Sequence, residues 1–314
     1  MDFSPLLTDL ETLHDCALCP RHCHADRFSP NDGYCQAGTG FSISSICIHR
    51  GEEPVISGSR GICNIFFTNC NLQCTYCQNY QISDNSRDHT YEEMPLHEVI
   101  RQIKEILATG INIVGFVSPS HFIPQMKIII KAIEGGGYHP TWVYNTNGYD
   151  SVEILSSLEG IIDVYLPDFK YMSSSVAKEL SDAPDYPEVA SAALKEMFRQ
   201  KGSALLINDQ GYAESGILIR HLVLPGQVEN SKNVLKFIAE EISPHLHIGL
   251  MSQYYPTDRV SRDPALGRAL TREEYTDVIA TMERLEMSKG FIQGMESFAH
   301  YRPDFNKNHP FEPD

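Results

Sequence analysis

Near-continuous apolar runs recur along the chain from residue 63 onward. Such runs are typical of parallel strands that other elements cover on both faces, because neither face then meets water. A further stretch, "LLINDQGYAESGILI", predicts an inserted hairpin. The pattern predicts six buried strands, over residues 63–67, 111–117, 141–146, 161–167, 216–224 and 245–252.

Apolar residues at helical spacing fill the intervals between these strands. The segment from Leu96 to Leu107 repeats them on one helix face, and Gly110 ends the pattern. The last predicted helix begins with a capping box of Thr271 and Glu274. Strands alternating with helices favour an α/β fold, a partial (β/α)6 TIM-like barrel, over a sandwich. The other helices are predicted over residues 124–134, 151–158, 187–200, 230–241 and 271–287.

The length of 314 residues fits one barrel with small additions, because barrels of this size fold as one unit. Hydrophobic residues make up 42% and charged residues 21% of the chain, which is ordinary for a globular protein with a sizeable core. The predicted division is a cysteine-rich segment over 1–58, the barrel over 59–300 and a loosely packed tail over 301–314, which is acidic and rich in proline.

The formal net charge is −16, which argues against nucleic acid or an anionic membrane as a partner, since both reward a basic surface. The first residues, "MDFSPLLTDLETLHDC", have acidic residues where a signal peptide needs a basic start. No apolar run approaches the length of a membrane span. We therefore expect a cytoplasmic protein.

All nine cysteines lie before residue 78, so their chemistry is localised. In a reducing compartment, clustered cysteines indicate metal binding or catalysis before disulfides. Cys70, Cys74 and Cys77 follow the first strand at the spacing C-x3-C-x2-C. Structural zinc and a closed 4Fe-4S cluster each take four ligands. A closed site on the three loop cysteines would therefore need a distant fourth ligand, either Cys47 or Cys63. Three thiolates alone would leave one iron open for a small molecule.

The three loop cysteines, with Tyr76 before the third, resemble the radical S-adenosylmethionine (SAM) signature. The chain is similar to the putative pyruvate formate-lyase activating proteins of that superfamily from about residue 16 to 295. The segments that carry this resemblance are "CALCPRHCHADR", "FFTNCNLQCTYCQNYQIS", "NTNG", "LPDFKY", "RHLVLPG" and "LMSQYYP".

This resemblance implies a six-stranded partial barrel and a 4Fe-4S cluster on Cys70, Cys74 and Cys77, with SAM on the open iron. Reductive cleavage of SAM would give a 5′-deoxyadenosyl radical that removes a hydrogen atom from a substrate. Asp168 would need a cationic partner, either Lys170 or a monovalent cation shared with neighbouring strand-end residues. The resemblance implies these SAM-binding candidates: Tyr76, Ser118, His121, Asn145, Thr146, Asp168, Lys170, Arg220 and Gln253.

Four further cysteines form a complete ligand set before the barrel. A structural zinc site and a second 4Fe-4S cluster both fit four thiolates, so both interpretations stay open. Arg21 and Arg27 beside them are predicted to serve packing and charge balance, and "GEEP" at 51–54 is predicted to be an acidic loop. The four cysteines are Cys16, Cys19, Cys23 and Cys35, at the spacing C-x2-C-x3-C-x11-C.

The sequence therefore favours a radical SAM enzyme that acts on a protein or peptide, with activation of a separate glycyl-radical enzyme as the implied reaction. A flavodoxin- or ferredoxin-type protein would supply the electron. Two alternatives remain: a radical SAM enzyme that acts on a small molecule or makes another peptide modification, and a metal-stabilised scaffold without catalysis.

Overall fold

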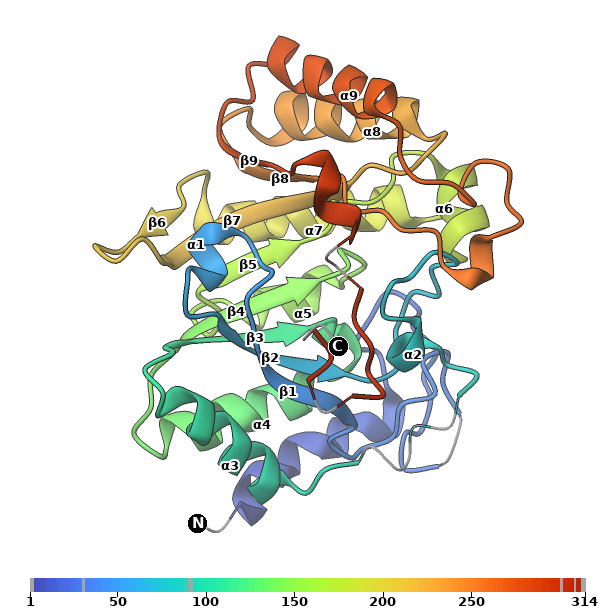
Figure 1. Ribbon diagram of the computed structural model, residues 1–314. Coiled ribbons are helices and arrows are strands. Elements are labelled where there is room, and N and C mark those ends of the chain that lie inside the picture. Colours follow the sequence, from blue (N-terminus) through green and yellow to red (C-terminus); the bar gives the residue numbers. More distant parts are fainter. Residues whose placement is uncertain are drawn as a thin grey trace.

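The computed structural model describes residues 3–29, 32–87, 89, 93–299, 302–307 and 309–311. Within them, nine strands form one sheet, in which strand order follows sequence order from β1 (Ile43–His49) to β9 (Gly290–Ile292). All strands from β2 (Ile62–Phe67) to β9 pair in parallel, apart from a short hairpin strand. Figure 1 shows the sheet curving as an arc rather than closing on itself. The α/β partial barrel predicted from the sequence is confirmed.

All six predicted strands are present, and most bounds differ from the prediction by a few residues. Their apolar residues are buried, as the continuous hydrophobic runs require. The predicted hairpin is also present, because β6 (Leu206–Ile207) pairs with β7 in antiparallel fashion. The remaining strands of the arc are β3 (Ile113–Val117), β4 (Thr141–Thr146), β5 (Val164–Pro167), β7 (Ala213–Leu222) and β8 (His247–Met251).

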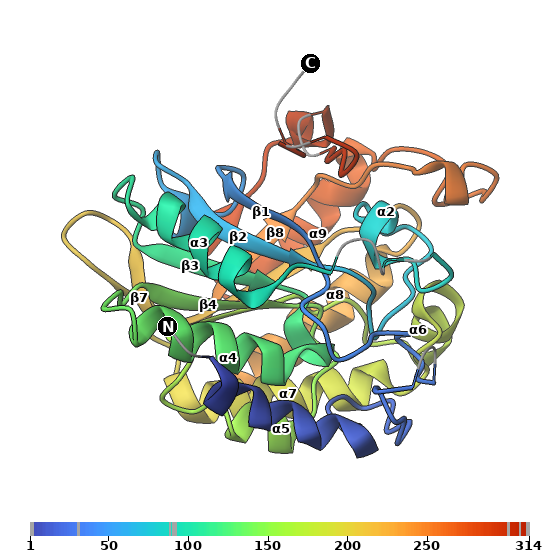
Figure 2. The same cartoon turned by 90° about the horizontal axis from the view of Figure 1, so that it is seen from below.

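Helices cover the convex face of the arc, and Figure 2 shows α4, α5 and α7 on that side. The predicted capping box is present, with the Thr271 hydroxyl accepting from the backbone N–H of Glu274 at 3.2 Å. The helices of eight or more residues are the 3₁₀ helix η1 (Ser4–Asp15) and the α-helices α3 (Leu96–Leu107), α4 (Ile123–Glu134), α6 (Ser174–Ser181), α7 (Tyr186–Lys201), α8 (Val228–Phe237) and α9 (Arg272–Arg284). The shorter ones are α1 (Pro54–Ser57), α2 (Tyr80–Ser83), η3 (Pro119–His121), α5 (Val152–Ser156), η4 (Ile238–Ile242), η5 (Asp258–Val260) and η6 (Met295–Ala299).

Two strands were not predicted. β1 alternates buried and half-buried residues and pairs antiparallel with β2, so it extends the sheet from within the predicted N-terminal segment. β9 is three residues long and adds a seventh parallel strand beside β8. Among the described residues, β1 and β9 are the two edges of the sheet, and the concave face lies between them.

The tail is not loosely packed, so that prediction is wrong for its described residues. Phe305 and Phe311 pack against an apolar cluster on the concave face that includes Phe66. The apolar surface that these two aromatic rings bury holds the segment on the sheet, although most of its other residues are polar. Residues 301, 308 and 312–314 of the predicted tail lie outside the described residues.

Candidate active site

The three loop cysteines lie at the mouth of the barrel, directly after β2. Asn69 takes a left-handed conformation, with φ of 62°, and starts the loop that carries them. Cys70 and Cys74 are buried and Cys77 is half-buried. All three line one cavity of about 430 Å³ on the concave side of the sheet. The carboxyl ends of parallel strands are where barrels build their sites, and this loop occupies that position.

Hydrogen-bond donors surround the loop sulfur atoms. The backbone N–H of Leu72 and the side-chain amide of Asn147 each lie 3.4 Å from the Sγ of Cys70. The hydroxyl of Ser181, at the end of α6, donates to the Sγ of Cys74 at 3.0 Å. The Sγ of Cys77 pairs with the hydroxyl of Ser83 at 3.2 Å. Donors in these positions suit thiolate sulfur, which accepts hydrogen bonds.

Burial sets the protonation of the Cys70 and Cys74 thiols. It raises the pKa of Cys70 to about 12, and it raises the pKa of Cys74 as well. The nearby Lys170 ammonium opposes this shift at Cys74. Without a bound metal the thiols of Cys70 and Cys74 therefore stay protonated, and a bound metal would deprotonate them.

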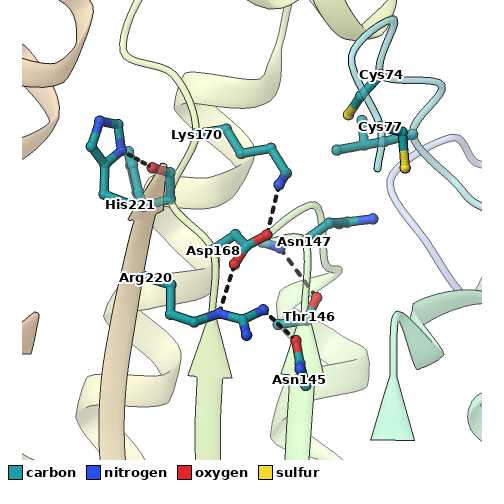
Figure 3. Close-up of polar contacts among 12 residues, drawn as sticks. Cys74, Cys77, Asn145, Thr146, Asn147, Asp168, Lys170, Arg220 and His221 are labelled. Carbon is teal, nitrogen blue, oxygen red and sulfur yellow. Dashed lines mark hydrogen bonds and ion pairs between the residues drawn. The ribbon is translucent and has the colours of Figure 1, made fainter. Parts of the chain in front are cut away.

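An ionic network lies beside the cysteine loop, and Figure 3 shows the Lys170 ammonium pointing toward Asp168. Lys170 Nζ lies 2.6 Å from one carboxylate oxygen of Asp168, and Arg220 Nε lies 2.9 Å from the other. Burial alone would raise the pKa of Asp168, but Arg220 and Lys170 together hold it below its usual value. Asp168 is therefore ionised, with a cation on each oxygen.

Arg220 joins this pair to the other side of the barrel. Its Nη2 donates to Asn145 Oδ1 at 2.6 Å, and its Nη1 lies 3.0 Å from a carboxylate oxygen of Glu52. The side-chain amide of Asn64 donates to the other oxygen of Glu52 at 2.9 Å. The prediction that "GEEP" is simply an acidic loop is wrong, because Glu52 takes part in this network with a side chain that is only 9% exposed. Loop carboxylates are usually solvated, so the sequence carried no signal for this contact.

Glu53 is the second acidic residue that the sequence analysis missed. Its carboxylate lines the same cavity, and its Oε2 is buried without a hydrogen-bond partner among the described residues. Burial raises the pKa of Glu53 to about 7, partly opposed by Arg220. Gly249 on β8 makes room for this side chain, since a Cβ there would lie 2.7 Å from Glu53 Oε1. The cavity therefore holds a carboxyl group that nothing in the described chain neutralises fully.

A family comparison identifies the chain. Residues 64–238, more than half of the sequence, match the model of the radical SAM superfamily. The chain belongs to this superfamily. An uncharacterised protein of Methanocaldococcus jannaschii is 28% identical over 281 residues, which cover 87% of this chain and 75% of that protein.

Several solved structures are similar at low identity. A domain of the pyruvate-formate lyase-activating enzyme from Bacteroides vulgatus is 18% identical, covering 55% of this chain and 92% of that one, with a TM-score of 0.40. SuiB from Streptococcus suis, bound to precursor peptide SuiA, is 15% identical, covering 74% of this chain and 48% of that one, with a TM-score of 0.46. The chain thus spans about half the length of SuiB.

Membership of the radical SAM superfamily implies a 4Fe-4S cluster and SAM as cofactors. Within the described part of the chain, no three His, Cys, Asp or Glu side chains are gathered closely enough to hold a single metal ion. A cubane makes a different demand, because each thiolate binds a different iron and the sulfur atoms lie further apart. Three thiols on one cavity wall, each with a hydrogen-bond donor, fit that demand.

Most other predicted SAM-binding residues lie on the same cavity. Ser118 follows β3 with φ of 53°, an uncommon conformation for a residue with a side chain. Gln253 receives a hydrogen bond from Gln293 at 2.7 Å. Tyr76 is buried, and its hydroxyl pairs with that of Tyr171 at 2.6 Å. The predicted residues that line the cavity are Tyr76, Ser118, Asn145, Thr146, Asp168, Lys170, Arg220 and Gln253.

Two predicted residues have other partners. The Thr146 hydroxyl donates to the buried Asp150 at 2.5 Å, so its oxygen faces that carboxylate. His121 is not among the residues that line the cavity. Its Nε2 lies 2.9 Å from the backbone oxygen of Thr68, and burial lowers its pKa to about 3. The structure therefore does not bring His121 to the site. Its neutral imidazole is buried and connects η3 to the backbone directly after β2.

The four N-terminal cysteines lie together but outside the cavity lining. Cys16, Cys23 and Cys35 each help to raise the pKa of Cys19, which burial raises to about 12. Arg21 connects this group to the cysteine loop by donating to the backbone oxygen of Asn71 at 2.9 Å.

No helix among the described residues has both the length and the apolar character to cross a membrane.

Proposed function

We propose that this radical SAM protein is an enzyme that removes a hydrogen atom from a protein or peptide, with Cys70, Cys74 and Cys77 as the ligands of its 4Fe-4S cluster. One observation carries the proposal. The three loop thiols and the Asp168–Arg220 ion pair line a single cavity. A scaffold needs thiols for a metal, but it has no need of a cavity with fixed charges beside them.

When bound, the cluster and SAM supply the reductive cleavage that yields a 5′-deoxyadenosyl radical. The chain's own residues would bind and orient these cofactors and exclude water from the cavity. Lys170 is proposed to hold the SAM carboxylate, since its ammonium lies between Asp168 and Cys74 and affects the pKa of that thiol. Asp168 keeps Lys170 charged, because the carboxylate raises the pKa of the ammonium against the effect of burial.

The other cavity residues are assigned positioning roles. Arg220 and Asn145 form a hydrogen bond with each other at 2.6 Å and fix one part of the cavity wall. Ser118 is proposed to face the amino group of SAM, because the residue lines the cavity and its hydroxyl makes no hydrogen bond to another side chain or to the backbone within the described residues. Asp168 already has cations on both oxygens, so Lys170 and Arg220 take the role considered for a monovalent cation.

The substrate assignment rests on the resemblance of "FFTNCNLQCTYCQNYQIS" and "LPDFKY" to the activating proteins. Activation of a glycyl-radical enzyme is the reaction that this resemblance implies, and a flavodoxin or ferredoxin is the implied electron donor. For the N-terminal cysteines this proposal keeps both zinc and a second cluster; zinc would require their sulfur atoms to move closer together than they lie in the structure. Their separation from the cavity lining favours a structural role.

Anaerobic reconstitution with iron and sulfide, followed by dithionite and SAM, tests the proposal. We expect 5′-deoxyadenosine above a control without cluster. Deuterium transfer into 5′-deoxyadenosine from a labelled glycyl-radical protein, compared with labelled metabolites, then tests the substrate class. Absence of 5′-deoxyadenosine from a protein with a full cluster would contradict the enzyme assignment and favour the scaffold.

A further inference from the structure

The last described residues of the chain cover part of the concave face. We call residues 302–307 and 309–311 the aromatic clasp. In Figure 1 the clasp runs in front of the sheet from η6 toward β1, and in Figure 2 it lies on the side opposite to α4, α5 and α7. Pro303 and Phe311 line the same cavity as the cysteine loop. The clasp therefore forms one wall of the candidate active site.

Two aromatic rings hold the clasp on the sheet. Phe305 and Phe311 each have a ring centroid 5.3 Å from that of Phe66 on β2. The ring of Phe311 also lies 4.1 Å from that of His49, at the end of β1. The rings pack against an apolar patch that consists of Cys47, Phe66, Ile82 and Val117.

Polar contacts tie the clasp to the segment that follows the cysteine loop. Gln81 in α2 donates to the Asp304 carboxylate at 3.0 Å and accepts from the backbone N–H of Phe305 at 2.8 Å. The clasp also closes on itself, because the backbone N–H of Asp304 donates to the backbone oxygen of Pro310 at 2.9 Å. It is thus a compact turn that presents two rings, held by contacts typical of a bound peptide.

We propose that the patch beneath the aromatic clasp is the docking surface of the substrate, and that a polypeptide segment with aromatic side chains takes the place of the clasp. This inference rests on the proposed function, since it names where the protein or peptide substrate binds. The contacts of the clasp indicate which groups such a segment should present. These are aromatic rings to pack against Phe66, and a backbone N–H and a carboxylate to bond with Gln81. While it is in place, the patch is unavailable to another polypeptide.

Two cysteines on neighbouring strands provide a matched pair of probes. Cys47 belongs to the patch, whereas Cys63 packs in the main core on the other face of the sheet. Both are buried, at 6% and 0% exposed. Release of the clasp should expose Cys47 alone, while unfolding of the barrel would expose both.

The experiment measures the rate at which iodoacetamide labels each cysteine in the full chain with its cluster loaded. In a Phe305→Ala/Phe311→Ala variant we expect labelling of Cys47 to rise at least tenfold, with Cys63 unchanged. Gln81→Ala, which removes only the polar ties, should give a smaller rise at Cys47. An unchanged Cys47 rate in both variants would overturn the proposal, and so would equal rises at both cysteines, since the clasp would then be an inseparable part of the fold.

A synthetic peptide of residues 302–314 then tests the docking surface. Added to the double variant, it should restore protection of Cys47, and the same peptide with both phenylalanines replaced by alanine should not. Equal protection by both peptides, or by neither, would overturn the proposal. Protection by N-acetylphenylalanine amide as strong as by the peptide would also overturn it, in favour of a small aromatic ligand. These measurements use no SAM, so their outcome is independent of 5′-deoxyadenosine formation.

Discussion

The two groups of cysteines differ in what surrounds their sulfur atoms. In the loop, Cys70 and Cys74 receive hydrogen bonds from Asn147 and Ser181, which come from distant parts of the sequence. A backbone N–H two residues further along the chain serves Cys70 in the loop just as it serves Cys19 and Cys35 in the N-terminal group, so the side chains from distant segments are what distinguish the loop. The loop thiols are therefore built into the barrel, and the N-terminal thiols into their own segment. Cysteines in the two groups are therefore expected to have different roles, and substitutions in each group should show this.

Removing a loop thiol should have the largest effect. Cys74→Ala is expected to lower 5′-deoxyadenosine formation at least a hundredfold, because in the proposed site three thiolates hold the cluster with none to spare. Product quantified after anaerobic reconstitution checks this. Cys63→Ala is the matched control, since it removes a buried thiol from β2 outside the cavity lining and should retain the activity. Substantial cleavage of SAM by the Cys74→Ala protein would contradict the catalytic role given to the loop cysteines in this comparison.

Removing an N-terminal thiol should affect stability instead. Cys16→Ser is expected to lower the thermal midpoint by about 5 °C or more, which corresponds to roughly 3 kcal/mol in a chain of this size. Activity per folded molecule should stay near that of the native protein. Loss of activity without loss of stability would show that this segment takes part in catalysis.

Metal analysis of the native protein sharpens the same contrast. About four irons with one zinc per chain would indicate a structural zinc site, and about eight irons a second cluster.

A charge beside the loop should have an intermediate effect. Asp168→Ala is expected to leave the cluster absorbance intact and to weaken SAM binding at least tenfold, or about 1.4 kcal/mol, because Lys170 and Arg220 lose their shared acceptor. Asp209→Ala, in the exposed hairpin turn, is the control. Added potassium or sodium should not change turnover of the native protein. A clear response to either ion would favour a bound monovalent cation.

The smallest effect is expected at Glu53, and it depends on pH. Because the folded-state pKa of about 7 lies above the ordinary value of 4.5, this group stabilises the fold most below pH 4.5, and that contribution is lost as the pH rises toward 7. Glu53→Gln should therefore have a flatter free energy of unfolding between these pH values than the native protein. Denaturant titrations across that window check it, with exposed Glu188→Gln as control. Parallel curves for Glu53→Gln and the native protein would contradict the assignment.

The six buried strands were predictable because a strand covered on both faces leaves a continuous apolar run in the sequence. The edge strand β1 also left a signal, since "ISSICIH" alternates apolar and polar residues, but its alternation is short. The three residues of β9 carry too little pattern to be recognised.

The ionic network shows why the site was only partly predictable. Spacing marks the cysteine loop, because its ligands are close in sequence. Glu52 and Arg220 meet across 168 positions of sequence, so only the fold brings them together. The position of His121 away from the cavity lining has the same origin: a polar residue after a strand faces either the cavity or the core, and the local sequence pattern does not distinguish the two.

The sequential order of the strands bears on how the protein is assembled during synthesis. Each strand from β2 to β8 finds its partner in the one made just before it, the short β6 aside, so the sheet grows by addition at one edge as the chain leaves the ribosome. The cysteine loop emerges directly after β2, and the clasp follows every strand in the sequence. We therefore expect a period during synthesis in which the barrel is complete but the clasp does not yet cover its concave face. In that period a protein that delivers the cluster could insert it without displacing the clasp.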